Sequence, residues 1–274
     1  ILSRRWRIIV PFSKEMILGA SGNQGAAGFY THQIEQSCRF DYADNSHFDR
    51  NYGDGTDGSN TDFTLSFWIK RVGRIGSTSV LINPRDGTSA TALNEVGWDT
   101  SNQFYFNNSN SGDTILKTNG VFRDPTSWFN LVISADLNNG TASERLKIYF
   151  NGNEMSYATD NRSSYTSAAG FGRGGSWVLG DYYSGTNYTP DMYLAEHVYI
   201  DGTTYGPDSF GETKQGVWIP KDVSGLTFGT LGYYLKFEDS SNLGNDSSGN
   251  DNDWTASDIG ADHQELQSPT NGTG

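Results

Sequence analysis

Hydrophobic and polar residues alternate in several short stretches of the chain. Within residues 63–70, Phe63, Leu65, Phe67 and Ile69 fall on one face, and the residues between them are mostly polar. A period of two is typical of a β-strand with one buried face. The alternation recurs four more times: at Phe129, Leu131 and Ile133; Leu146, Ile148 and Phe150; Leu194, Val198 and Ile200; and Tyr233, Leu235 and Phe237. The pattern therefore predicts five strands.

Turn signals separate these stretches. Five Asx-Gly pairs offer the positive φ angles that tight hairpins need, at Asp54-Gly55, Asp86-Gly87, Asn139-Gly140, Asn151-Gly152 and Asp201-Gly202. No segment has a sustained helical period with caps, and only residues 207–212 suit one short turn. We predict an all-β chain of antiparallel sheets rather than a parallel βαβ fold.

Composition narrows the class of protein. A length of 274 residues fits one large β domain, and 14% aromatic residues with 33 glycines suit short strands and tight turns. A net charge of −13 argues against binding to phosphate backbones, so we predict no nucleic-acid partner. No apolar stretch is long enough to span a membrane, and we predict no membrane partner. The single cysteine, Cys38, excludes an intrachain disulfide and a thiolate zinc site.

The chain divides into three regions. Residues 1–30 open with a basic, apolar stretch and continue into glycine-rich sequence, so we interpret them as an arm that anchors on a neighbouring subunit through Trp6, Ile8, Ile9 and Phe12. A disordered terminus is the alternative. We assign residues 31–258 to the sandwich, and residues 259–274 to a C-terminal linker or tail.

Three segments resemble the laminin G-like branch of the concanavalin A-like lectin and glucanase superfamily. They are Phe63–Arg71 (FTLSFWIKR), the pair Trp128–Ser134 (WFNLVIS) and Leu146–Gly152 (LKIYFNG), and Tyr193–Gly202 (YLAEHVYIDG). Their order and spacing match the family over about residues 40–202. The resemblance implies a two-sheet, antiparallel jelly-roll sandwich.

A narrower resemblance concerns Ile17–Gly22, Gln36–Asp41 and the polar tail Gly232–Thr255. These segments look like a group found in structural proteins of tailed bacteriophages, where the sandwich forms a fibre, an appendage or a surface decoration. The resemblance implies a location on the virion, with other virion subunits as partners. It also implies a homo-oligomer, and a trimer by analogy with fibre proteins.

The sequence argues against an enzyme. Glucanases of this superfamily carry a Glu-x-Asp-x-Glu triplet, because nucleophile and acid must project from the same face of a strand into the cleft. The chain contains no such triplet. Glu196 lies on a predicted strand, and we expect a structural role for it. We therefore predict no catalytic residues.

One loop is the candidate binding region. Tyr182, Tyr183, Asn187, Tyr188 and Asp191 gather tyrosine rings that stack on sugars and polar groups that bond hydroxyls. A glycan on a host surface is the ligand that this chemistry suggests. A subunit interface and simple loop packing are the alternatives.

A second polar run raises the question of a metal. Asp246, Asn250 and Asp253 supply oxygen atoms of the kind that calcium binds, and calcium is the one cofactor that the sequence suggests. The run lacks the ligand spacing of an EF-hand, and we favour an Asx-rich turn without an ion.

Together these features predict a non-enzymatic structural protein of a virion, in which a lectin-like sandwich mediates subunit assembly and contacts host glycans. Two alternatives stay open: a secreted carbohydrate-binding lectin domain and, as a third choice, a glycoside hydrolase with an unusual site.

Overall fold

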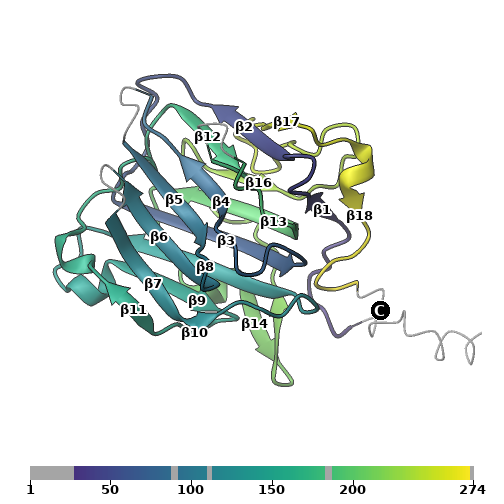
Figure 1. Cartoon of the computed structure of the whole chain (residues 1–274), viewed down its shortest axis with the longest axis horizontal. Helices are drawn as coiled ribbons and strands as arrows, with labels where there is room; N and C mark the ends of the chain where they lie inside the picture. The colour runs from purple at the N-terminus through teal and green to yellow at the C-terminus, as the bar shows by residue number, and fades with distance from the viewer. Residues whose placement is uncertain (1–27, 88–91, 110–112, 183–186, 272–274) are drawn as a thin grey trace, which may run out of the picture.

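The computed structural model describes residues 28–87, 92–109, 113–182 and 187–271. Over these residues the chain forms two eight-stranded sheets that pack face to face, together with a small two-stranded sheet (Figure 1). Every pairing between named strands is antiparallel. The prediction of an all-β, two-sheet antiparallel sandwich is confirmed.

The first sheet contains all five strands that alternation predicts. Its order is β10 (Asn153–Glu154), β9 (Leu146–Phe150), β8 (Phe129–Asp136), β3 (Asp62–Arg71), β13 (Met192–Asp201), β1 (Ser37–Phe40) and β18 (Gln264–Glu265). In addition, β16 (Tyr233–Leu235) pairs with β13.

The second sheet was not predicted from alternation. Its order is β11 (Tyr157–Asp160), β7 (Asp113–Val121), β6 (Gln103–Ser109), β5 (Leu93–Trp98), β4 (Ser79–Pro84), β12 (Ser176–Leu179), β2 (His47–Asn51) and β17 (Thr255–Ser257). Strand β4 is buried at all six positions, so its sequence cannot alternate between apolar and solvent-facing residues.

The remaining elements are short. The two-stranded hairpin of β14 (Gly211–Lys214) and β15 (Val217–Pro220) projects from the body of the sandwich (Figure 1). Four 3-10 turns complete the structure: η1 (Ala142–Glu144), η2 (Arg162–Ser164), η3 (Pro207–Ser209) and η4 (Ala261–His263). The first three residues of the predicted short turn form η3. No helix in the described part of the chain is long and apolar enough to cross a membrane.

The main core lies between the inner faces of the two sheets. Phe63, Leu65, Phe67 and Ile69 of β3 are all fully buried there, as their alternation predicts. A second, smaller apolar cluster lies on the outer face of the first sheet, where the chain between β13 and β16 covers it. Its buried members are Val132, Val198, Ile200, Phe210, Val223, Phe228 and Tyr234.

A β-bulge in β13 corrects one prediction. Leu194, Val198 and Ile200 were expected on the same face, but Leu194 lies in the main core and the other two in the outer cluster. Ala195 pairs with Trp68 and Val198 with Ser66, so that Glu196 and His197 together stand opposite Phe67. One extra residue reverses the facing of every later side chain in the strand.

The turn prediction holds in part. Asn151 and Gly152 have φ angles of 45° and 79° and form the two-residue loop between β9 and β10. Gly55 and Gly202 also have positive φ. Gly87 and Gly140 do not, and the prediction is wrong there.

Both ends of the described chain join the first sheet. Strand β18 pairs with β1, and the hydroxyl of Thr270 accepts a bond from the Ile34 backbone N–H at 2.8 Å. Residues 264–271, which the sequence assigns to a linker, are thus part of the sandwich. The structure does not describe residues 1–27 of the predicted arm, which include Trp6, Ile8, Ile9 and Phe12.

His197 is the most unusual residue of the core. Its ring is fully buried and stacks between Phe67 and Tyr233, with centroids 5.6 Å and 5.5 Å apart. Among the described residues neither ring nitrogen has a hydrogen-bond partner. Burial lowers the pKa of His197 to about 3, so the ring is neutral.

The variant His197→Phe should therefore be more stable by about 1 kcal/mol at pH 7, since it removes unpartnered polar atoms without losing the stack. The unfolded histidine takes up a proton below pH 6.5 and the folded one does not. The stability of the wild type should thus fall between pH 6.5 and about 3, by up to about 1.4 kcal/mol per pH unit, and the advantage of the variant should grow. Urea unfolding at pH 7, 6 and 5 measures both effects. If the variant were less stable than the wild type at pH 7, the interpretation of His197 as a neutral core residue without hydrogen-bond partners would be wrong.

Candidate functional site

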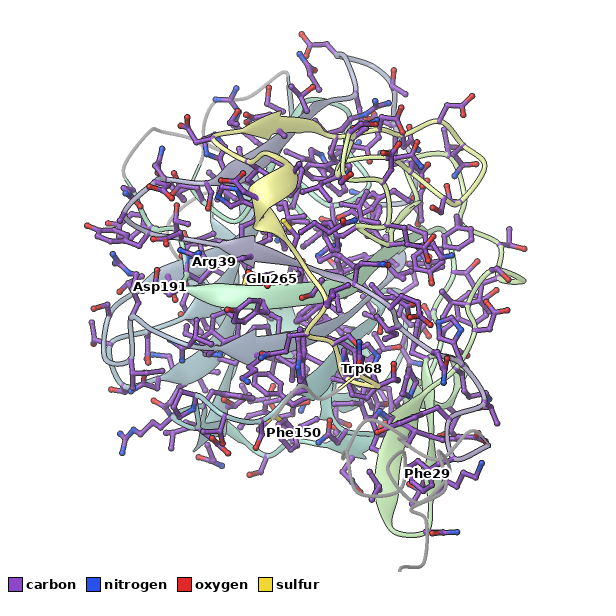
Figure 2. All side chains as sticks on the ribbon, turned by 90° about the vertical axis from the view of Figure 1, so that its right-hand side faces the viewer. Phe29, Arg39, Trp68, Phe150, Asp191 and Glu265 are labelled. Carbon is purple, nitrogen blue, oxygen red and sulfur yellow. The ribbon has the colours of Figure 1, made fainter. Side chains whose placement is uncertain are left out.

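Three loops meet at one end of the sandwich: residues 41–46, residues 72–78, and the described parts of a third loop, which are residues 180–182 and 187–191. Asp191 joins them, because its backbone oxygen accepts the N–H groups of Val72 at 2.9 Å and Gly73 at 3.2 Å. Its side-chain Oδ1 accepts the N–H of Tyr42 at 2.8 Å. Asn187 donates from Nδ2 to the backbone oxygen of Tyr42 at 2.9 Å. The loops are thus bonded into one unit. In the view of Figure 2, Asp191 and Phe29 lie on opposite sides of the molecule.

Aromatic side chains gather on this unit, and we call Tyr42, Arg74, Tyr182 and Tyr188 the tyrosine site. Tyr182 and Tyr188 meet edge to face, with centroids 5.9 Å apart. Tyr42 is 40% exposed, and the Arg74 guanidinium lies 3.7 Å from its ring centroid. Such a cation–π contact holds both side chains in place at the surface.

A buried carboxylate fixes the position of Tyr188. Asp181 is 2% exposed, and its Oδ1 accepts the N–H of Tyr188 at 2.6 Å. The backbone oxygen of Tyr188 accepts the N–H of Val80, at the beginning of β4, at 2.9 Å. Hydrogen bonds to an ionised acceptor are stronger than neutral ones, so this loop is held firmly against the second sheet.

The structure sorts the five predicted binding residues into three groups. Tyr182 and Tyr188 belong to the tyrosine site. Asn187 and Asp191 also lie there, but their bonds position the backbone of Tyr42. Tyr183 lies outside the described residues. The sequence analysis missed Tyr42 and Arg74, for which the only local signal was an Asx-rich turn after Phe40.

Glu196 lies at the bulge of β13 with a φ of 45° and is 6% exposed. Its Oε1 accepts the hydroxyl proton of Tyr234 at 2.5 Å and pairs with Nε2 of His32 at 2.6 Å. The hydrogen bond to Glu196 raises the pKa of His32, although burial opposes it. These contacts join the N-terminal segment and β16 to the central strand, which agrees with a structural role.

The next acidic residue on the same strand is also engaged. Asp201 is 5% exposed, and its two oxygens accept the N–H groups of Ser59 at 2.7 Å and Leu231 at 3.1 Å. A glycosidase needs one carboxylate free to attack or to activate water and a second free to donate a proton. Glu196 and Asp201 instead hold other segments of the chain.

The acidic tail that suggested calcium is a hydrogen-bonded loop. Asp246 is 9% exposed, and its Oδ1 accepts the N–H groups of Tyr234 and Ser248, each at 2.8 Å. Its Oδ2 accepts the Ser248 hydroxyl at 2.7 Å and the Asn252 N–H at 2.9 Å. Four donors therefore surround the carboxylate where a cation would have to bind.

The other two candidate calcium ligands also form hydrogen bonds within the fold, Asn250 through its Nδ2 and Asp253 through its Oδ1. Asn250 donates from Nδ2 to the backbone oxygens of Gly229 at 2.7 Å and Gly232 at 2.9 Å. Asp253 accepts the N–H of Asp246 at 2.7 Å. Within the residues that the structure describes, no three His, Cys, Asp or Glu side chains form a metal-binding group. The geometry favours the Asx-rich turn over a calcium site.

Comparison with known proteins gives one family match. Residues 46–190, more than half of the chain, match the model of the concanavalin A-like lectin/glucanases superfamily. No curated protein sequence matches the chain.

Solved structures with similar folds include a heptameric SAP-like pentraxin from Limulus polyphemus, with a TM-score of 0.44 and 13% identity, covering 64% of this chain and 80% of the pentraxin. Domains LG4-5 of the mouse laminin alpha1 chain have a TM-score of 0.42 and 11% identity, covering 64% and 44%. A Trypanosoma rangeli sialidase has a TM-score of 0.38 and 15% identity, covering 54% and 21%.

The role of the acidic tail can be tested with the variant Asp246→Asn. An amide group in place of one carboxylate oxygen faces N–H and O–H donors, so we expect a loss of about 2 kcal/mol in the free energy of unfolding. The control is Asp251→Asn, which makes the same charge change at an exposed position of the same loop and should change stability little. Thermal unfolding with EDTA and with calcium should give the same Tm. A rise in Tm of several degrees with calcium would show that the loop binds the ion and would support the predicted metal site.

Proposed function

Because the chain belongs to the concanavalin A-like lectin/glucanase superfamily, we propose that it is a non-catalytic recognition domain of a virion structural protein, which contacts host-surface glycans through the tyrosine site. The observation that carries this proposal is the joining of three loops around Tyr42, Tyr182 and Tyr188. These loops come from distant parts of the sequence, and hydrogen bonds join Tyr42, which is 40% exposed, to the loop that carries the half-buried Tyr182 and Tyr188.

The chemistry of the tyrosine site suits a sugar. Exposed aromatic faces stack on the apolar face of a pyranose, and polar groups at the rim bond its hydroxyls. Asp191 and Asn187 bond the backbone N–H and C=O groups of Tyr42. The Arg74 guanidinium lies over the ring, so the ring needs little ordering on binding. A site that is ordered in advance loses less entropy when it binds.

Two features support a binding protein rather than an enzyme. The sequence has no Glu-x-Asp-x-Glu triplet, and both carboxylates near the end of β13 are committed to hydrogen bonds within the fold. A glycoside hydrolase would need a pair of free carboxylates. Binding of a glycan without hydrolysis needs only the tyrosine site.

The virion setting rests on the resemblance of Ile17–Gly22, Gln36–Asp41 and Gly232–Thr255 to phage structural proteins. In that setting the partners are other virion subunits, and the chain forms a homo-oligomer. The second candidate, a secreted lectin domain, would use the same tyrosine site. Electron microscopy of the particles separates the two, because only the virion protein appears there in repeated copies.

Glycan binding can be tested with an array of surface polysaccharides and calorimetry on the best ligand. Tyr42→Ala and Tyr188→Ala should each weaken binding at least about tenfold, which corresponds to about 1.4 kcal/mol of lost stacking. Tyr30→Ala is the matched control, because Tyr30 packs on Phe29, outside the tyrosine site. Unchanged affinity in both site variants would reject this surface. Release of sugar products would reject the non-catalytic role.

A further inference from the structure

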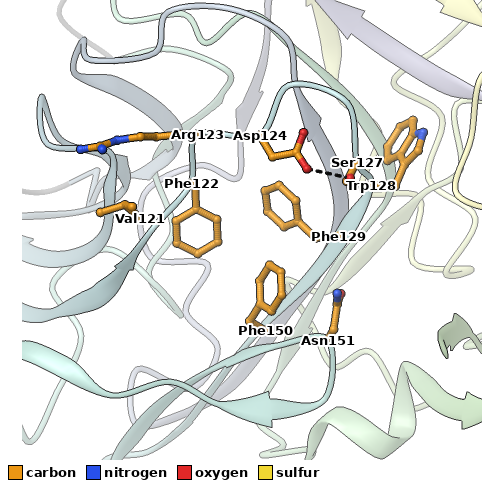
Figure 3. Close-up of a pocket in the computed structure, with 9 residues that line it drawn as sticks. All are labelled: Val121, Phe122, Arg123, Asp124, Ser127, Trp128, Phe129, Phe150 and Asn151. Atoms are coloured by element: carbon orange, nitrogen blue, oxygen red, sulfur yellow. Dashed lines mark hydrogen bonds between the residues drawn. The ribbon is translucent and has the colours of Figure 1, made fainter. Parts of the chain in front are cut away.

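An apolar groove opens at the edge of the sandwich, beyond the end of β7. Two adjoining hollows of about 270 and 230 Å³ share Val121, Phe122 and Phe150 in their walls. Figure 3 shows the rings of Phe122, Phe129 and Phe150 turned toward one another in the larger hollow. The main core thus reaches the surface here.

The groove is preformed. The centroids of Phe122 and Phe129 lie 5.3 Å apart, and those of Phe129 and Phe150 lie 5.6 Å apart. Arg71 is 1% exposed, donates to the backbone oxygen of Phe122 at 2.8 Å and stacks over Trp98. The wall that carries Phe122 is therefore anchored from inside the protein.

The groove lacks an apolar cover within the described residues, and its rim is charged. Val121 is 47% exposed although it lies beside three phenylalanines. Asp124 at the rim bonds the hydroxyls of Thr126 and Ser127, and these bonds hold its pKa at about 2. Arg123 beside it is exposed. The rim thus offers one cation and one anion, so a ligand of this groove should combine apolar side chains with a charge that pairs with one of them, and a basic ligand would pair with Asp124.

We propose that this groove binds residues 6–12 of a neighbouring copy of the chain. This segment lies outside the described residues and contains Trp6, Ile8, Ile9, Val10 and Phe12, with Arg7 among them. It supplies the large apolar side chains that the groove can bury and a cation for Asp124.

Charge favours a contact between copies. The chain carries a net charge of −13, so two copies repel each other. The first fourteen residues are the exception, because Arg4, Arg5, Arg7 and Lys14 occur there without an acidic residue. Binding of this basic stretch to an acidic neighbour offsets the repulsion, and salt should weaken it.

The route of the chain also favours a neighbour. Lys214 of β14 donates to the backbone oxygen of Gly28 at 2.9 Å and lies over the Phe29 ring. The hairpin of β14 and β15 projects from the body, and Figure 2 shows Phe29 next to it and Phe150 on the body. The preceding residues therefore begin at the most protruding part of the molecule. The seventeen residues from Phe12 to Gly28 span up to roughly 50 Å when extended, which is enough to reach another subunit.

This inference deepens the assembly role of the proposed function and is independent of the glycan role. A failed glycan screen leaves it untouched, and a failed crosslink leaves the tyrosine site untouched.

Cysteine crosslinking of the full-length chain tests the contact. Full-length Ile9→Cys and full-length Val121→Cys are mixed and oxidised, and the products are separated on a non-reducing gel and identified by mass spectrometry. Cys38 does not interfere, because it is fully buried and burial raises the pKa of its thiol. A disulfide-linked heterodimer joining positions 9 and 121 is expected, with a yield that falls at 1 M salt.

The matched control is Val217→Cys, which replaces an equally exposed valine on the hairpin that holds Gly28. It should give at least about fivefold less heterodimer with Ile9→Cys. Equal yields would show that tethering alone brings the cysteines together, and would overturn the proposal. The double variant Ile9→Cys/Val121→Cys adds a further check. If it gives only a monomer with an internal disulfide, the segment binds the groove of its own chain. That result would also reject the contact between copies.

Discussion

The structure depends on the bulge in the central strand β13. A regular strand would place Val198 and Ile200 on the same face as Leu194, inside the sandwich, and remove both from the outer face, where they pack with Val132. The extra residue at Glu196 and His197 reverses the second half of the strand. His197 and Tyr199 then enter the main core, and Val198 and Ile200 form the base of a third layer. β1 pairs with the first half of β13, and β16 pairs with the second half.

The bulge also attaches two other segments of the chain to the central strand. Glu196 leaves the regular ladder and bonds both His32 and Tyr234, so one carboxylate joins the N-terminal segment and β16 to the centre of the sheet. The covered outer face leaves other regions for binding. These are the loops around the tyrosine site and the edge where Phe122, Phe129 and Phe150 reach the surface.

Sequence pattern predicted the first sheet and missed the second, for a physical reason. Strands β3, β8 and β9 carry apolar residues every second position, which the alternation test detects. Strand β4 is buried throughout, and β5 places Asn94 in the interior, where its side chain accepts the N–H groups of Gly170 and Phe171. The sequences of β4 and β5 do not alternate between apolar and polar residues, whereas that of β8 does, although β8 is buried at seven of its eight positions. The candidate loop was predicted because three tyrosines are close in sequence, whereas Tyr42 and Arg74 join it only through tertiary contacts that no local pattern encodes.

Several acidic residues stabilise the fold through hydrogen bonds, in addition to giving the chain its negative charge. Four aspartates accept backbone N–H groups: Asp181 within its own loop, and Asp191, Asp201 and Asp246 from other segments of the chain. Bonds of this kind contribute about 1.5–3 kcal/mol each, and they constrain loops in a chain whose single cysteine cannot form an internal disulfide. Each N–H donor occupies an acceptor position on the carboxylate that a metal ion would otherwise use. Hydrogen bonds within the chain therefore hold these loops in place, and they engage both oxygens of Asp201 at the end of β13.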